Sequence, residues 1–204
     1  MEIKISKKPV KYEEAIEYLD ERVQEVSQNK KKELIWFLEH RSVYTCGVNF
    51  NQKDVLDKKV KIVKTNRGGK ITWHGPGQLV CYFVVDISKR RKDIRKFITA
   101  IENSIIETLK DFKIISFSDR KNIGIWVMDN KKEKKVAAIG FRIKKWIAFH
   151  GFSLNLSNSL NSYKKIIPCG ISDKGVSRIY DFKKNLKKKI IDKLKIKLVT
   201  NLKY

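Results

Sequence analysis

The chain has 204 residues, of which 42% are hydrophobic, so it can bury a core and we expect a single domain over residues 1–204. No run approaches the roughly eighteen apolar residues of a membrane-spanning helix, and the charged start lacks the apolar core of a signal peptide. We therefore expect a cytoplasmic protein without a membrane span. The formal net charge of +24 would attract nucleic acid, anionic membranes or acidic proteins, although a solvated lysine-rich surface is the simpler explanation.

The thiols and imidazoles are too few and too scattered for a disulfide framework or a metal centre. The three cysteines, Cys46, Cys81 and Cys169, include no Cys-x-x-Cys pair. The three histidines show no His-Glu-x-x-His spacing. We therefore expect reduced cysteines and no metal site.

Three segments carry apolar residues at helical spacing and are predicted helices. They cover residues 11–28, residues 92–112, and residues from about 179 to 198. Tyr12 is the first apolar position of the first helix. The expected buried face of the third helix holds Phe182, Leu186, Ile190, Ile191 and Leu194.

Seven shorter segments between these helices have the apolar, β-branched and aromatic character of strands. They are LIWFLEH, SVYTCGV, VKIVKT, QLVCYFVVDI, IGIWVM, KVAAIGFRI and KWIAFHGFSLNL. Most of them follow one another through short turns, without helices in between. The pattern predicts an α+β domain with a mixed, largely antiparallel β-sheet packed with helices.

The stretch RGGKITWHGPGQ, residues 67–78, is unusually rich in glycine. Glycine serves where the chain needs a positive φ or where something approaches the backbone closely. Two consecutive tight turns would account for the stretch. A ligand lying against the loop would account for it equally well.

Cys169 is the candidate nucleophile, because Pro168 and Gly170 place it outside regular structure, where a thiol can react. Backbone N–H groups of such a turn can also stabilise a thiolate or an oxyanion. Cys46 and Cys81 lie in apolar strands and are expected to be buried. The thiol needs a base, and the residues alone favour His74 and His150. The lysines at positions 131, 132, 134 and 135 look like a solvated hairpin.

Three segments together resemble the octanoyltransferases of lipoate biosynthesis, within the lipoate/biotin protein ligase superfamily. RGGKITWHGPGQLVCY resembles the family's Arg-Gly-Gly, Thr-aromatic-His and Gly-Pro-Gly-Gln signature. KVAAIGFRIKKWIAFHGFSLNL resembles its lysine-strand segment, and IIPCGI resembles its cysteine segment. With EHRSVYTCG, the resemblance covers residues from about 33 to 180 and implies the biotin/lipoate protein ligase-like catalytic fold.

Transferred residue by residue, the resemblance implies that Cys169 is the acyl-thioester nucleophile and that Lys135 is the essential lysine. Trp73 stands where tyrosine is usual, and Ser153 where alanine is usual, and both differences can alter the shape of the acyl pocket. The acyl-binding residues that the resemblance implies are Arg67, Gly68, Gly69, Lys70, Ile71, Thr72, Trp73, His74, Ala138, Ile139, Gly140, Gly151, Phe152 and Ser153.

The implied reaction transfers octanoyl in two steps and needs no cofactor. Cys169 takes octanoyl from the thiol of acyl carrier protein and yields it to a lysine amine on a lipoyl domain. The acceptors are the E2 subunits of 2-oxoacid dehydrogenases and the glycine cleavage H protein. On this interpretation the glycines of the loop let its backbone approach the acyl chain, and the positive charge attracts the acidic carrier protein.

Two other functions remain as alternatives. An ATP-dependent lipoate or biotin protein ligase shares the implied fold. Lipoate ligases, however, carry aspartate after the histidine, where this chain has Gly75, and they need no cysteine like Cys169. A basic nucleic-acid-binding protein would suit the charge, but the sequence has no RNP1 strand or KH loop.

Overall fold

The computed structural model describes residues 1–171 and 173–203, and this part of the chain forms three α-helices and eleven strands. The helices are α1 (Tyr12–Ser27), α2 (Ile94–Asp111) and α3 (Lys187–Asn201). The strands are β1 (Glu2–Ile5), β2 (Leu34–Leu38), β3 (Val43–Cys46), β4 (Ile62–Lys64), β5 (Ile71–His74), β6 (Gln78–Asp86), β7 (Phe117–Ser118), β8 (Ile125–Asp129), β9 (Lys132–Lys144), β10 (Ile147–Asn155) and β11 (Gly175–Val176).

The strands form one large sheet and one small sheet. The large sheet has the order β1-β2-β6-β10-β9-β8-β7, with β11 paired to β9, and only the β1–β2 and β9–β11 pairs are parallel. The small sheet has the order β4-β3-β5, in which β3 and β5 are antiparallel. The prediction of a mixed, largely antiparallel sheet is confirmed.

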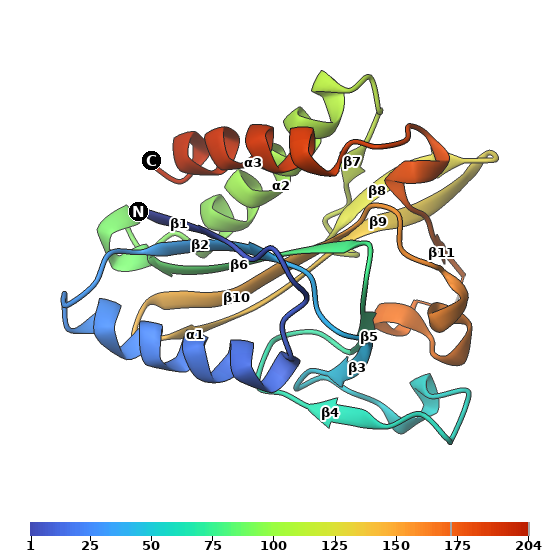
Figure 1. Cartoon of the computed structure of the whole chain (residues 1–204), viewed down its shortest axis with the longest axis horizontal. Helices are drawn as coiled ribbons and strands as arrows, with labels where there is room; N and C mark the ends of the chain where they lie inside the picture. Colours follow the sequence, from blue (N-terminus) through green and yellow to red (C-terminus); the bar gives the residue numbers. More distant parts are fainter. Residues whose placement is uncertain (172, 204) are drawn as a thin grey trace.

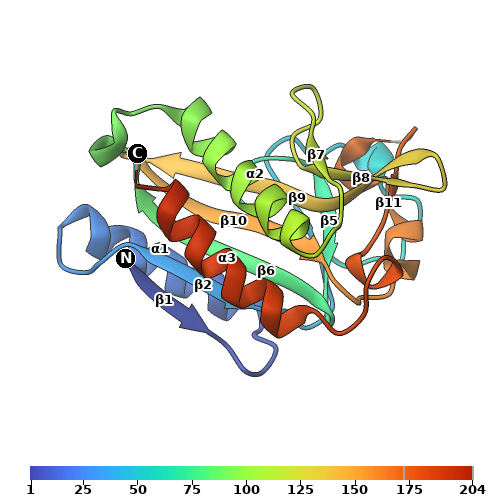
Figure 2. The same cartoon turned by 90° about the horizontal axis from the view of Figure 1, so that it is seen from above.

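Helices cover both faces of the large sheet (Figure 1), with α2 and α3 on one face and α1 on the other. Viewed from above, α2 and α3 lie side by side across the sheet (Figure 2). Each face of the sheet has its own hydrophobic core, and alternate residues of the central strands point into one core or the other. Ile35 and Phe37 of β2 face α2 and α3, whereas Leu34 and Trp36 face α1.

The small sheet packs near the N-terminal end of α1, where the rings of Tyr12 and His74 stack with centroids 6.2 Å apart. Its apolar side chains form a third cluster with Tyr163 and Ile166. Because β5 leads through a short turn directly into β6, the small sheet is held at one end of the large one.

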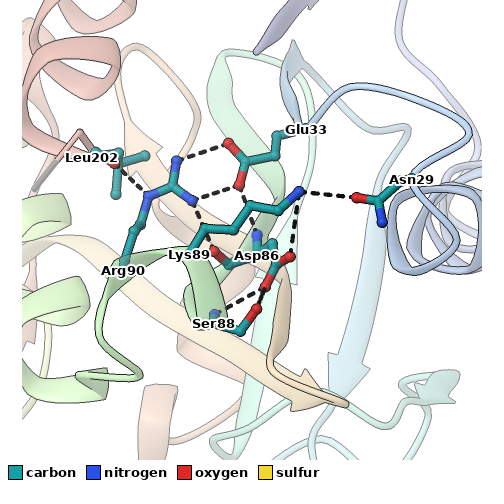
Figure 3. A network of polar contacts seen from close by, with 7 residues as sticks. All are labelled: Asn29, Glu33, Asp86, Ser88, Lys89, Arg90 and Leu202. Atoms are coloured by element: carbon teal, nitrogen blue, oxygen red, sulfur yellow. Dashed lines mark hydrogen bonds and ion pairs between the residues drawn. The ribbon is translucent and has the colours of Figure 1, made fainter.

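Arg90 links the large sheet, at the end of β6, to the C-terminal end of α3 (Figure 3). The two terminal nitrogens of Arg90 donate to the two carboxylate oxygens of Glu33, and Nε donates to the backbone oxygen of Leu202. Asp86 contributes a backbone acceptor to the same guanidinium. The contacts join the residue before β2, the last residue of β6 and the residue after α3.

All seven predicted strands are present, but the third predicted helix begins too early. Residues 179–181 form a 3₁₀ turn, and α3 begins only at Lys187. Asn185 adopts a left-handed φ of 57°, which interrupts a right-handed helix. As a result Phe182 is 40% exposed and does not belong to the core, contrary to the sequence prediction.

Candidate active site

Cys169 lies in a tight 3₁₀ turn, Pro168–Gly170, with a left-handed φ of 57° that is uncommon for a residue with a side chain. The N–H of Gly170 donates to Ile167 O, and the N–H of Ile171 donates to Pro168 O, which fixes the turn. These two N–H groups are therefore engaged within the turn. The thiol is half-buried, whereas those of Cys46 and Cys81 are buried as predicted.

Lys135 is buried on β9, with 7% of its surface exposed. Its ammonium donates to Ile123 O at 3.0 Å and lies 4.7 Å from the ring centroid of Trp126. The solvated-hairpin interpretation is therefore wrong for Lys135, whereas Lys134 is half-buried and pairs with Asp129 at the hairpin. A buried amine held by one carbonyl and an aromatic face is well placed for chemistry.

Gly124 leaves the room that the Lys135 side chain occupies. A Cβ at Gly124 would lie 3.1 Å from Lys135 Cε and 2.7 Å from Ala137 O. Gly124 also has a φ of +142°, which side-chain-bearing residues rarely adopt. A glycine is therefore required beside this lysine.

Two adjoining hollows meet at Cys169 and Lys135, which line both of them. The smaller one, of about 20 Å³, also has Thr72, Ser153 and Tyr163 in its wall. The larger one is a cavity of about 570 Å³ that extends from the thiol toward α1. We call this larger space the acyl cavity, because it is the candidate binding site for the acyl chain.

The structure brings most of the predicted acyl-binding residues to the acyl cavity. Ile71 and Trp73 are the exceptions, because alternate residues of β5 face opposite ways, and both side chains pack in the cluster under the small sheet. The predicted residues that line the cavity are Arg67, Gly68, Gly69, Lys70, Thr72, His74, Ala138, Ile139, Gly140, Gly151, Phe152 and Ser153.

Close contacts within the protein already require glycine at several positions of the loop, whether or not a ligand is bound. A Cβ on Gly68 would lie 2.9 Å from Phe141 O, one on Gly75 would overlap the ring of Trp73, and one on Gly77 would overlap the backbone of Asn158. Gly75 and Gly77 do not line the acyl cavity. For these two, the expectation that a side chain would block an acyl chain is wrong.

A buried polar network lies beside the thiol. Gln78 Nε2 donates to Tyr163 Oη at 2.8 Å and to Asn155 Oδ1 at 3.0 Å, and Gln78 Oε1 contacts His74 Nδ1 at 2.7 Å. Burial raises the pKa of Tyr163 well above its usual value, and the neighbouring Cys169 raises it further. Tyr163 therefore stays protonated. No sequence motif pointed to it, because it lies in a short 3₁₀ helix, Asn161–Lys165, outside the predicted helices and strands.

The two histidines that the sequence favoured as bases are both buried in the wall of the acyl cavity. Burial lowers the pKa of His74 and of His150 to about 3; His40 adds to the lowering at His74, and the charge of Arg67 adds to it at both. Both rings are therefore neutral at pH 7 and too weakly basic to hold a thiol proton. Lys135 is the better candidate for proton transfer.

Within residues 1–171 and 173–203 there is no group of three metal-ligating side chains. No helix of this part of the chain is long and apolar enough to cross a membrane.

The sequence is similar to known octanoyltransferases over most of its length. The protein of Wolbachia sp. subsp. Brugia malayi (strain TRS) is 42% identical over 176 residues, which cover 86% of each chain. The protein of Parvibaculum lavamentivorans is 40% identical over 185 residues, which cover 88% of this chain and 82% of its own.

Solved structures share the fold at low sequence identity. A bi-partite lipoate protein ligase from Thermoplasma acidophilum superposes with a TM-score of 0.72 at 12% identity, over 99% of this chain and 84% of its own. Biotin protein ligase from Aquifex aeolicus gives 0.58 at 14% identity, over 98% and 70%.

The family model of the lipoyl protein ligase A/B catalytic domain matches residues 11–202. The chain therefore belongs to the lipoyl protein ligase A/B catalytic family, and its relatives of about 40% identity within that family make it an acyltransferase of the octanoyltransferase type.

Proposed function

We propose that this acyltransferase moves octanoyl from acyl carrier protein to a lysine of a lipoyl domain through a thioester on Cys169. The observation that carries the proposal is that Cys169 and Lys135 line the same two hollows, one of them large enough to hold an acyl chain. The names of the close relatives supply the octanoyl group. The acceptor is suggested by a structural neighbour, a lipoate protein ligase studied with its E2 lipoyl domain.

In the first step, Lys135 in its amine form takes the proton of the Cys169 thiol, and the sulfur attacks the carbonyl carbon of the donor thioester. A new carbon–sulfur bond forms and the bond to the donor sulfur breaks. The leaving thiolate takes the proton from the Lys135 ammonium. The products are octanoyl-Cys169 and the free donor thiol.

In the second step, the amine of the acceptor lysine attacks the carbonyl carbon of octanoyl-Cys169. An amide bond forms, the bond to the Cys169 sulfur breaks, and Lys135 takes the proton that the amine loses. The thiolate of Cys169 is returned beside a protonated Lys135. No nucleotide enters either step, because the energy for the amide bond is already stored in the thioester.

An ATP-dependent ligase of the same fold is the second candidate, since both structural neighbours named above are ligases. Those likenesses lie at or below 14% identity and support the fold alone. The transferase is favoured because Cys169 projects from a turn with a left-handed φ, and an adenylating enzyme needs no such thiol.

The remaining parts of the proposal concern location and partners. We place the reaction in the cytoplasm, where thiols such as Cys169 stay reduced. The net charge of +24 suits acidic partners and would speed their encounter with this chain. The acceptors proposed are the E2 subunits of 2-oxoacid dehydrogenases and the glycine cleavage H protein.

The test is intact-protein mass spectrometry after mixing with octanoyl-acyl carrier protein. The parent chain should gain one octanoyl group, Cys169→Ser should gain none, and Lys135→Ala should be acylated about a hundredfold more slowly. Lys134→Ala is the matched control, because Lys134 neighbours Lys135 on β9 but pairs with Asp129. It should be acylated at the parent rate.

Adding an apo lipoyl domain should then move the octanoyl group from Cys169 to the domain. A parent chain that takes up no acyl group, but releases pyrophosphate from ATP with free octanoate, would overturn the proposal in favour of the ligase.

A further inference from the structure

Three buried polar atoms in the wall of the acyl cavity have no hydrogen-bond partner among the described residues. They are Tyr12 Oη, Arg67 Nε and His150 Nδ1, on side chains of residues that are 4%, 8% and 1% exposed. Tyr12 Oη lies near Thr65, Arg67 and Tyr82 without a hydrogen bond of acceptable geometry to any of them. A buried polar group without a partner is costly, so three around one cavity indicate that something polar is bound there.

The three residues come from separate elements that meet at the end of the cavity near α1. The ring of Tyr12 contacts His40 and His74, with centroids 5.2 and 6.2 Å away, and the ring of Tyr82 contacts that of His150 at 6.4 Å. This end is therefore formed by polar rings, although the rest of the surroundings of α1 is an apolar core.

His150 reaches this end through an unusual backbone conformation. Regular alternation along β10 would place its side chain on the α2 and α3 face, together with Ala148 and Phe152. A left-handed φ of 70° accompanies a ring that instead stacks on Phe149 and contacts Tyr82, two members of the α1-side core. Strained residues of this kind concentrate at functional sites.

Arg67 brings a positive charge that has no carboxylate partner among the described residues. Its terminal nitrogens donate to the backbone oxygens of Gly68, Thr45 and Lys70 at 2.9 to 3.0 Å, and to the Thr45 hydroxyl. These contacts fix the guanidinium, and Nε is its one nitrogen without a hydrogen-bond partner among the described residues.

The unpartnered atoms differ in what they require. Arg67 Nε–H can only donate. His150 Nε2 faces Asn66 Oδ1 at 2.8 Å and carries the ring hydrogen, so Nδ1 of the neutral ring can only accept. The Tyr12 hydroxyl can do both. A hydroxyl group or a water molecule, which donates and accepts, suits this set, whereas a carboxylate lacks the hydrogen that Nδ1 needs and a methyl group offers nothing.

We propose that Tyr12, Arg67 and His150 form a hydroxyl-binding subsite that ends the acyl cavity and determines which acyl chains are accepted. Water occupies the subsite when a plain octanoyl chain fills the rest, and the terminal hydroxyl of a longer acyl chain replaces that water. The inference deepens the proposed function and rests on it.

The distances along β10 suit this role. Ser153 lies beside Cys169 in the smaller hollow, and His150 is three residues away along the strand, or about 10 Å. An extended octanoyl chain has a similar length. A longer plain chain would push its methyl end among the polar atoms, displace their water and leave them unpaired.

The test compares plain acyl pantetheine thioesters, from hexanoyl to dodecanoyl, with thioesters of the same lengths that carry a terminal hydroxyl. The readout is the rate at which each acylates Cys169, followed by intact mass. Plain chains longer than octanoyl should react more slowly, and the terminal hydroxyl should restore the rate about tenfold, which corresponds to about 1.4 kcal/mol.

Tyr12→Phe should make the longer plain chains react faster relative to octanoyl and should reduce the gain from the terminal hydroxyl. Tyr18→Phe is the matched control, because Tyr18 lies on the same helix and accepts a hydrogen bond from Arg22 without lining the cavity. Its chain-length profile should equal that of the parent.

The subsite is overturned if the terminal hydroxyl brings no gain in the parent, or if Tyr12→Phe keeps the parent's profile. In either case an octanoyl adduct on Cys169 would leave the proposed function standing. If no thioester acylates the parent, and octanoyl-acyl carrier protein does not either, both proposals fail.

Discussion

Gly151 offers a direct test of how tightly the strands around the acyl cavity are packed. A Cβ at this position would lie 1.9 Å from Cys81 O and 3.1 Å from Tyr82 Cα, both in the backbone of the adjacent strand β6. Ordinary contact begins at 3.4 Å, so the first distance is 1.5 Å too short. Because no flexible side chain is available to move aside, Gly151→Ala must separate β6 from β10.

We expect the substitution to destabilise the protein by about 3 kcal/mol or more, at the upper end of the cost of overpacking, because the β6–β10 hydrogen bonds would also lengthen. In a chain of this size each kcal/mol corresponds to about 2–4 °C, so the melting temperature should fall by about 6–12 °C. Calorimetry or circular dichroism would measure the shift.

Gly175→Ala is the matched control. Its Cβ would come no closer than 3.6 Å, to carbon atoms of the flexible Lys134 side chain, so its melting temperature should change by about 2 °C at most. Equal melting temperatures for Gly151→Ala and Gly175→Ala would refute the packing argument, because only the first has a backbone atom in the way.

Three further outcomes are expected. In the folded protein His74 and His150 have a pKa of about 3, against 6.5 for the ordinary side chain, so between these pH values the unfolded state binds more protons than the folded state. Each histidine should therefore lower the free energy of unfolding by about 2 kcal/mol at pH 5. The melting temperature should fall from pH 7 to pH 5. A flat profile would contradict their burial. Arg90→Ala should lose about 1–3 kcal/mol and speed amide exchange at the end of α3, whereas Lys11→Ala, at an exposed ion pair, should lose under about 0.5. Transfer from acyl carrier protein should fall steeply with salt while a small acyl thioester is little affected; equal salt dependence would exclude a docking role for the charge.

The sequence predicts the elements whose periodicity is strong. The strands β6 and β10 and the helices α1 and α2 appear where their apolar spacing placed them, because packing against a common core rewards that spacing. The strand β5 was missed, since its four residues lie between glycines and resemble a turn. The early start predicted for the third helix has a different cause, the left-handed Asn185, which periodicity cannot reveal.

The candidate site was only partly predictable for the same kind of reason. Pattern alone could not separate Lys135 from Lys134, because the difference lies in tertiary contacts: one amine is buried against Trp126 and the other pairs with Asp129. Tyr12 was predicted correctly as an inward-facing position of α1. Its hydroxyl matters only because the fold places it at the end of a cavity.

The acyl cavity has a left-handed, non-glycine residue at each end, Cys169 with φ of 57° and His150 with φ of 70°. Each such conformation costs on the order of 1–3 kcal/mol and persists only where the surrounding structure holds it. At Cys169 the turn's own hydrogen bonds hold it, and the residue lines the same cavity as Lys135. At His150 the stacking on Phe149 and the contact with Asn66 hold it. The result is a polar ring on the α1 side of the sheet, whereas regular alternation would place it on the opposite side. Relaxing His150 to an ordinary strand conformation would bury its ring in the apolar core beneath α2 and α3, so the left-handed conformation keeps this polar ring beside the cavity and out of the core.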